Sequence, residues 1–257
     1  MKPILVQLGP FPISSFGLFL LLAFLIGIAV ARRRGPQVGI DPPHMLDIAL
    51  YMIIGGILVG RLGFAVVNFP AFAQSPLSIL TIWKDSGLTF YGALLGGLIV
   101  GAVYARGRQI PLRRFLDVFA PALALGYAVA MVGALLHGLY LGRPSGVPWA
   151  VEMLLDRRHP TQIYLLLASL GTYFVLRAQE RQTLAPGSLF FLWLLLYALA
   201  RVAVEFFVES PPVLGPLTLA HLTNIAAALI AIMGLVVSAR RPAEEPATQP
   251  AATQDAG

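Results

Sequence analysis

Long apolar runs separated by short polar segments dominate the sequence. Most of the runs are long enough to cross a hydrocarbon layer of about 30 Å, which takes about 20 helical residues. Strands of a membrane β-barrel are shorter and alternate in polarity, so the pattern indicates helices. We therefore predict an all-α polytopic bundle of about seven transmembrane spans, at 11–31, 46–69, 88–105, 115–141, 161–176, 188–208 and 217–237.

Composition agrees with a chain surrounded by lipid. Hydrophobic residues make up 58% and charged residues only 12% of the 257 residues, and the mean hydropathy is +0.79. The net charge of +6 does not indicate nucleic-acid binding, because the arginines form short clusters between apolar runs and not one basic face. The chain has no cysteine, so a thiol in its chemistry must come from a substrate.

The distribution of positive charge predicts an orientation in the bacterial inner membrane. With the N-terminus outside, the inside loops hold eleven arginines, whereas the outside segments hold five lysine or arginine residues. Positive residues are retained on the cytoplasmic side, so we predict an outside N-terminus and a cytoplasmic C-terminus. Arg32, Arg33 and Arg34 follow the first run instead of preceding it, so this run is a true span and not a signal peptide.

The sequence predicts one membrane domain and a tail. Residues 1–240 form the single transmembrane domain, and 241–257, rich in Pro, Ala and Gln, form a disordered cytoplasmic tail. Two outside segments, near 70–87 and 142–160, carry prolines and a tryptophan each. Tryptophan favours the membrane interface, so we expect these segments to be half-embedded elements or lids.

Two arginines and a glutamate lie well inside predicted spans. Arg61 is in the second span, and Arg201 is in the sixth, four residues before Glu205, which places this pair on one helix face. A structural ion pair and a snorkelling Arg61 are the plain alternatives. Since an embedded charge costs at least about 2.5–3.5 kcal/mol, both arginines are candidate functional residues. The planar fork of arginine suits a lipid phosphate.

Three histidines near the spans, His137, His159 and His221, can titrate near neutral pH. Each alone is more often a hydrogen-bonded structural residue than a base. The sequence contains no HExxH, no His pair at i,i+4 and no carboxylate cluster, so we expect neither a metal nor a cofactor.

Five segments in order resemble the phosphatidylglycerol–prolipoprotein diacylglyceryl transferase family. They are a Gly-Arg motif at 60–64, a segment similar to Ser-Phe-His-Gly-Gly at 87–96, the start of the family's fourth span at 116–121, His-Pro-x-Gln-x-Tyr at 159–164 and Tyr-x-x-x-Arg-x-x-x-Glu at 197–205. The resemblance extends from residue 12 to about 232.

The departures from the family pattern fall on its polar positions. The signature Gly-Arg-x-Gly-Asn-Phe-x-Asn-Gly-Glu-x-x-Gly-Arg corresponds to 130–143. Among the replaced residues, Met131 stands for an arginine, Ala134 for an asparagine, Leu139 for a glutamate, Tyr91 for a histidine, Phe16 for a tyrosine and Val208 for a second arginine. This chain is therefore expected to be a divergent member.

The resemblance implies transfer of the diacylglyceryl group of phosphatidylglycerol to the lipobox cysteine thiol of a prolipoprotein. It implies phospholipid contacts from Arg61, Arg201, Glu205, Arg143, Tyr197 and Gln162, and catalytic roles for His137, His159 and Tyr91. Either histidine would be the base, and Tyr91 would orient the headgroup. Arg143 can replace the arginine missing at 131 only if the chain folds back after Gly142.

Two other functions stay open at this point. A catalytically silent or repurposed homologue that binds phospholipid or lipoprotein explains the replacements at 91, 131, 134 and 139 directly. A small transporter is the weaker alternative, because the sequence shows no internal repeat.

Overall fold

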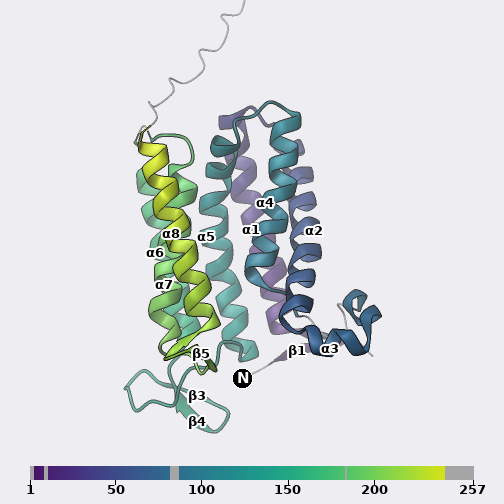
Figure 1. Ribbon diagram of the computed structural model, residues 1–257, viewed down its shortest axis with the longest axis vertical. Coiled ribbons are helices and arrows are strands. Elements are labelled where there is room, and N and C mark those ends of the chain that lie inside the picture. Colours follow the sequence, from purple (N-terminus) through teal and green to yellow (C-terminus); the bar gives the residue numbers. More distant parts are fainter. Residues whose placement is uncertain (1–2, 9–10, 82–86, 183, 241–257) are drawn as a thin grey trace, which may run out of the picture.

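The computed structural model describes residues 3–8, 11–81, 87–182 and 184–240, and these form a bundle of long helices (Figure 1). The all-α prediction is confirmed. Six helices in the described part of the chain are long and apolar enough to cross a membrane. The tail predicted at 241–257 lies outside the described residues, and the assignment of 1–240 to one domain stays a prediction. The helices are α1 (Ser15–Arg34), α2 (Pro42–Val67), the short α3 (Phe69–Gln74), α4 (Phe90–Gly107), α5 (Leu112–His137), α6 (Thr161–Gln179), α7 (Ser188–Glu205) and α8 (Leu219–Ala239).

Helix α6 corresponds to the fifth predicted span, 161–176, and it is more polar than the other long helices. Its 19 residues give it a length of about 28 Å at 1.5 Å per residue. The polar side chains of Ser169 and Thr172 are buried, and Ser169 Oγ donates a hydrogen bond to the carbonyl oxygen of Ala124 on α5 at 2.7 Å. The polarity of α6 is therefore directed into the bundle. That α6 crosses the membrane stays a prediction.

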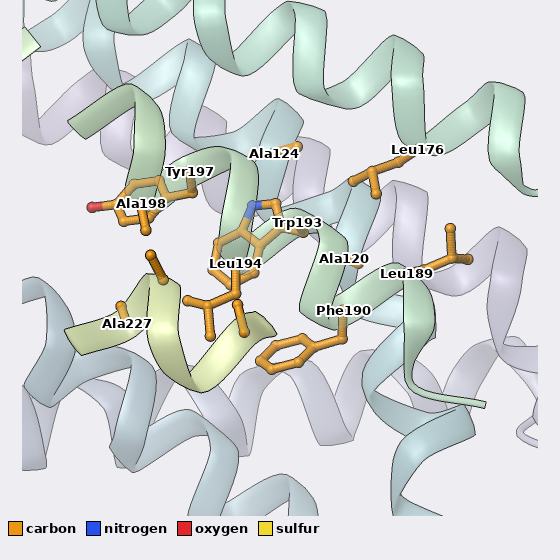
Figure 2. Packing of buried hydrophobic residues seen from close by; sticks show 12 residues of the cluster. Ala120, Ala124, Leu176, Leu189, Phe190, Trp193, Leu194, Tyr197, Ala198 and Ala227 are labelled. Carbon is orange, nitrogen blue, oxygen red and sulfur yellow. The ribbon is translucent and has the colours of Figure 1, made fainter. Parts of the chain in front are cut away.

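Helix α5 lies in the middle of the bundle and separates two groups of helices (Figure 1). Helix α1 packs along α5 on one side, where α2 and α4 also lie and pack mainly on each other. On the other side, α6 packs on α5 and α7, and α7 packs on α8. The main cluster of buried side chains belongs to this second group, and in Figure 2 Trp193 and Tyr197 of α7 lie within it.

Glycines allow α2 and α4 to approach closely. A Cβ atom added at Gly92 would lie 2.9 Å from the carbonyl oxygen of Val59, and one added at Gly56 would lie 2.9 Å from that of Ala93. Thr89 N donates to the carbonyl oxygen of Gly60 at 3.1 Å, immediately before α4 begins. Such backbone contact is the usual way in which small residues join membrane helices.

The first span begins later than the sequence predicts. Strands β1 (Ile4–Leu8) and β2 (Phe11–Ser14) form an antiparallel hairpin, and α1 starts only at Ser15. Ser14 caps the helix, since its Oγ accepts a hydrogen bond from the backbone N–H of Gly17 at 3.0 Å. The prediction of helix from residue 11 is therefore wrong at its first four residues.

Two other predicted spans end early for a local reason. Helix α5 ends at His137 because Gly138 adopts a left-handed conformation (φ 88°). Helix α7 ends at Glu205, and the chain then turns so that Val208 forms an antiparallel bridge with Gly142. The prediction of helix at 138–141 and 206–208 is therefore wrong, because these residues form loops.

Polar contacts join the helix ends at the side opposite the N-terminus. The guanidinium of Arg34 is buried, donates from Nε to the carbonyl oxygen of Val118 at 3.0 Å and forms an ion pair with Glu180. The carboxylate of Asp117 accepts hydrogen bonds from the backbone N–H groups of Gly187 at 2.6 Å and Phe190 at 2.9 Å, which caps the start of α7.

The two segments expected outside lie at the same end of the bundle as the N-terminal hairpin (Figure 1). The first contains α3 and the 3₁₀ turn Pro76–Leu80, and its residues 82–86 are outside the described part of the chain. The second contains the hairpin of β3 (Val151–Met153) and β4 (Asp156–Arg158). A third hairpin, β5 (Pro212–Leu214) with β6 (Leu217–Thr218), precedes α8. Their half-embedded position and the orientation of the bundle stay predictions.

Candidate functional site

Arg201 and Glu205 form the ion pair that their spacing predicts. Nη2 of Arg201 donates to Oε2 of Glu205 at 3.1 Å, and the two side chains are only 9% and 2% exposed. A buried pair of this kind is stable only when its other polar atoms are also satisfied. The contacts of each partner therefore decide what the pair can do.

Glu205 is held from a second helix. Thr218 Oγ1 donates to Oε1 of Glu205 at 2.9 Å, so both carboxylate oxygens have a donor. Thr218 is also the N-cap of α8, where it forms a capping box with His221: the backbone N–H of His221 donates to Thr218 Oγ1, and His221 Nδ1 accepts from the backbone N–H of Thr218 at 3.2 Å. Through Nδ1, His221 therefore stabilises the first turn of α8.

Aromatic rings surround Arg201. Its Cζ lies 5.1 Å from the centroid of the Tyr140 ring, a distance typical of a cation–π contact. The phenols of Tyr127 and Tyr197 also lie within electrostatic range of the guanidinium. Tyr197 is the centre of this group: its ring packs edge-on against Tyr127 at 5.1 Å and stacks on Phe90 at 4.8 Å. Tyr127 and Tyr197 also line a small cavity between α5, α6 and α7.

Arg201 retains one unused edge. Its Nη1 is buried and has no hydrogen-bond partner in the described part of the chain. The phenols around it can donate and accept hydrogen bonds. A phosphate oxygen placed at Nη1 would therefore find a permanent cation and several hydroxyl groups within reach.

Gln162 and Thr161 hold Tyr140 in position, and no hydrogen bond joins either of them to Arg201 in the described part of the chain. The amide Nε2 of Gln162 donates to the carbonyl oxygens of Leu139 and of Tyr140, the latter at 3.3 Å, and Thr161 Oγ1 donates to that of Tyr140. Tyr140 has a left-handed backbone (φ 55°), which is unusual for a bulky residue. These bonds from the start of α6 hold the loop after α5 in the conformation that places the Tyr140 ring against Arg201.

Tyr91 joins the site from α4. Its hydroxyl donates to Oδ1 of Asn224 on α8 at 2.7 Å, and Nδ2 of Asn224 donates to the carbonyl oxygen of Ala220. The Tyr91 ring also lies edge-on to that of Tyr197, at 6.4 Å between centroids. Tyr91, Tyr197 and Arg201 thus belong to one site.

Apolar side chains fill the positions at which the family pattern has cations. Met131 and Val208, which stand for two arginines, belong to one buried cluster together with Ala134, Leu165 and Val204. Val204 precedes Glu205 on α7, so this cluster adjoins the ion pair. The family's polar residues at 131, 134 and 208 are therefore all absent from one region, and apolar side chains pack together there.

The two candidate bases differ in their surroundings. His159 Nδ1 lies 3.1 Å from the hydroxyl of Tyr164, which also accepts a hydrogen bond from Trp149 Nε1 at 2.7 Å. The His159 ring packs on Phe207 at 4.9 Å, just past the end of α7. His137 ends α5, and its Nδ1 is buried without a partner among the described residues. No hydrogen bond joins either ring to the Arg201–Glu205 pair in the described part of the chain, and their catalytic assignment stays a prediction.

Arg143 lies where the chain folds back, as expected. Its backbone N–H donates to the carbonyl oxygen of Phe207 at 2.8 Å, and its Nε donates to that of Val208 at 3.2 Å. The side chain is exposed at the end of the bundle and not in the apolar cluster around Met131. Arg143 is therefore placed to meet a headgroup at the surface, and its role as a phospholipid ligand stays a prediction.

Arg61 holds a different part of the molecule. It is buried in α2, and its three nitrogens donate to carbonyl oxygens of the segment that follows: Nε to Ile79 at 2.9 Å, Nη2 to Ser78 at 2.8 Å and Nη1 to Gly87 at 3.1 Å. Its Cζ also lies 5.2 Å from the centroid of the Phe72 ring. These contacts explain Arg61 as an anchor of the turn 76–80 and of Gly87. They do not bring it to Arg201, and its assignment to the phospholipid stays a prediction.

Sequence reasoning missed Tyr140, Thr218, Asn224 and Tyr127. Asn224 and Tyr127 are polar groups inside predicted spans, a signal that could have singled them out. Thr218 and His221 have the spacing of a capping box. Nothing in the sequence indicated Tyr140, because its position depends on the turn after α5. Among the described residues, no group of three His, Asp or Glu side chains is placed to hold a metal ion.

The fold and the site together define a class: a multi-pass membrane protein with a buried, partly unsatisfied arginine near one end of its bundle. A sequence model of the prolipoprotein diacylglyceryl transferase family matches residues 3–237. The chain belongs to this family and is a protein of the bacterial inner membrane.

Named relatives cover nearly the whole chain. The phosphatidylglycerol–prolipoprotein diacylglyceryl transferase of Synechococcus elongatus is 33% identical over 250 residues, 91% of this chain and 86% of the relative. The protein of the same name from Chromohalobacter salexigens is 32% identical over 259 residues, 97% of each chain. That of Bacillus cereus is 30% identical over 248 residues, 90% of each chain.

Proposed function

We propose that this chain transfers the diacylglyceryl group of phosphatidylglycerol to the thiol of the lipobox cysteine in a prolipoprotein. The observation that carries the proposal is the buried Arg201–Glu205 pair, whose Nη1 atom has no hydrogen-bond partner in the described part of the chain. It lies in a chain that matches the transferase family from residue 3 to 237. The relatives are named for both substrates, phosphatidylglycerol and prolipoprotein.

The reaction is a displacement at carbon. The substrate cysteine loses its proton. Its sulfur then attacks the carbon of the diacylglyceryl unit that carries the phosphate ester. A C–S bond forms while the C–O bond to phosphate breaks, and glycerol phosphate leaves with the electron pair of that bond. The negative charge that leaves on the phosphate needs a fixed cation, and the thiol needs a proton acceptor.

Arg201 supplies the cation in this proposal. Glu205, which is itself held by Thr218, fixes one side of the guanidinium, and Tyr140 covers one face, so the guanidinium keeps its orientation when a phosphate reaches Nη1. Tyr91 and Tyr197 would bind headgroup oxygens from the side of α4 and α7. Since Tyr140 and Tyr91 are only half-buried, they are the side chains that can move aside when the headgroup enters.

The proton acceptor is assigned to His159 or His137. A cysteine thiol has an unperturbed pKa of about 8.5, so a neutral imidazole close to a cation is sufficient to remove the proton. His159 is the better placed of the two, because its ring contacts Phe207, two residues beyond Glu205.

The experiment is a transfer assay with the full chain in nanodiscs that contain phosphatidylglycerol. A lipobox peptide is added, and the thioether product and glycerol phosphate are measured by mass spectrometry. We expect product from the wild type and a loss of at least about 100-fold in Arg201→Ala, because removal of one charge-stabilising donor costs about 10²–10³ in rate. Arg106→Ala, which removes an exposed arginine at the other end of α4, is the matched control and should retain full activity.

The apolar cluster around Met131 favours a second candidate, a relative that binds phospholipid without transferring it. Two cationic positions of the family pattern are buried and apolar here. In that case the assay gives no product with any phospholipid, while binding of phosphatidylglycerol still decreases in Arg201→Ala. Product formation that does not depend on Arg201 contradicts both candidates.

A further inference from the structure

The tip of the β3–β4 hairpin has an unusual sequence for its geometry. Met153 pairs with Asp156, so Leu154 and Leu155 alone form the loop. Both have positive φ, 52° and 72°, as in the type I′ turn that joins tightly twisted strands. Such turns favour Asn-Gly, because asparagine and glycine tolerate this backbone and leucine does not.

Solvation adds a second cost at the same position. Leu154 is 66% exposed and Leu155 is 104% exposed in the absence of a surrounding membrane. Two adjacent leucines at the tip therefore gain nothing from the protein core. Turn geometry and water solubility would both favour polar residues here, so the leucines indicate a contact with an apolar phase outside the chain.

The position of the hairpin relative to the helices indicates which phase this is. Only two residues separate the end of β4 from the start of α6. The 19 residues of α6 span about 28 Å, nearly the whole hydrocarbon layer of about 30 Å. If α6 crosses the bilayer, the hairpin emerges at the depth of the lipid headgroups, as its position beyond the helix ends in Figure 1 also indicates.

Two other residues of the segment 142–160 favour this depth. Trp149, on the loop before β3, is 61% exposed, and its indole N–H is satisfied by Tyr164. Arg157 on β4 is exposed. Tryptophan and arginine gather at the boundary between hydrocarbon and water, where the ring is in the apolar region and the charge meets lipid phosphate.

We propose that Leu154 and Leu155 insert into the outer headgroup and acyl boundary of the lipid bilayer and anchor the loop 142–160 to the membrane surface. Through β4, this anchor fixes His159, Thr161 and Gln162, and through the latter two the loop that carries Tyr140. The bilayer thus helps to hold the cover of Arg201. The inference concerns membrane contact and does not depend on the transfer reaction.

The absence of cysteine in the chain makes a direct test available. A nitroxide is attached to Leu155→Cys in nanodiscs, and its collision with oxygen, which is enriched in lipid, is compared with its collision with a water-soluble nickel chelate. Leu229→Cys on the exposed apolar face of α8 gives the lipid reference, and Gln182→Cys in the polar loop after α6 gives the water reference. We expect an oxygen-to-nickel ratio several-fold above that of the label at 182.

A second variant separates insertion from simple packing. Leu154→Asn, made in the protein labelled at 155, removes half of the apolar tip and relieves backbone strain. The oxygen-to-nickel ratio should therefore decrease towards the water reference, while thermal stability stays equal or increases. A ratio at 155 equal to that at 182 overturns the proposal. So does shielding that appears only after a lipobox peptide is added, since the tip then binds peptide and not lipid.

Discussion

Met131 and Val208 lie in the same buried apolar cluster, although they are far apart in sequence and stand for two arginines of the family pattern. Their proximity shows that one region of the site has changed from polar to apolar as a unit. A single substitution back to arginine therefore meets packed side chains and not a prepared anion site.

We predict that Met131→Arg destabilises the protein and does not restore a phosphate site. A buried cation without a partner costs roughly 3–5 kcal/mol, whereas Met131→Leu conserves volume and costs less than about 1.5 kcal/mol. Thermal unfolding in nanodiscs measures both. An unchanged midpoint with tighter phosphatidylglycerol binding in Met131→Arg would mean that the cluster is open to headgroups.

The role of Tyr140 is separable from its hydroxyl. Tyr140→Phe keeps the ring over Arg201, so kcat/KM should stay within about 3-fold of the wild type, whereas Tyr140→Leu removes a cation–π contact of about 0.5–2 kcal/mol and should lower it by about 3- to 30-fold. The transfer assay measures both variants. An equal loss in Phe and Leu would assign the function to the hydroxyl and not to the ring.

His221 should be structural. A glutamine at the fourth position of a capping box can accept a hydrogen bond from the backbone N–H of Thr218, as the imidazole does. His221→Gln should therefore keep both stability and activity. His221→Leu leaves this N–H unsatisfied and should cost about 1–3 kcal/mol in the free energy of unfolding. A His221→Gln protein that unfolds normally but has no activity would instead identify His221 as a proton acceptor.

Arg61 should affect order at one end of the bundle. Arg61→Lys keeps the charge but lacks the fork that reaches three carbonyl oxygens, so backbone amides at 75–81 should exchange hydrogen faster in both Arg61→Lys and Arg61→Ala. Exchange in α7 should not change. Wild-type exchange rates at 75–81 in Arg61→Ala would contradict the anchoring role.

The sequence predicted the helices and the central ion pair because both rest on local rules. Apolar length defines a span, and the i,i+4 spacing of Arg201 and Glu205 brings them to one helix face in any helix. The partners of that pair could not be predicted, since Tyr140 and Thr218 reach it only through the packing of other helices. For Arg61 the sequence shows only that a buried arginine is costly, and not whether a carbonyl or a phosphate satisfies it.

The hydrogen bonds from Ser169 to the Ala124 carbonyl and from Tyr91 to Asn224 also bear on how the bundle assembles. Inside a bilayer, an apolar helix face gains little by exchanging lipid for protein, so hydrophobicity inserts the helices but does not choose their neighbours. These two bonds link α6 to α5 and α4 to α8. Interhelical hydrogen bonds of this kind therefore distinguish correct from incorrect partners among helices that insert independently. Loss of one such bond would produce a protein whose helices are inserted but wrongly packed.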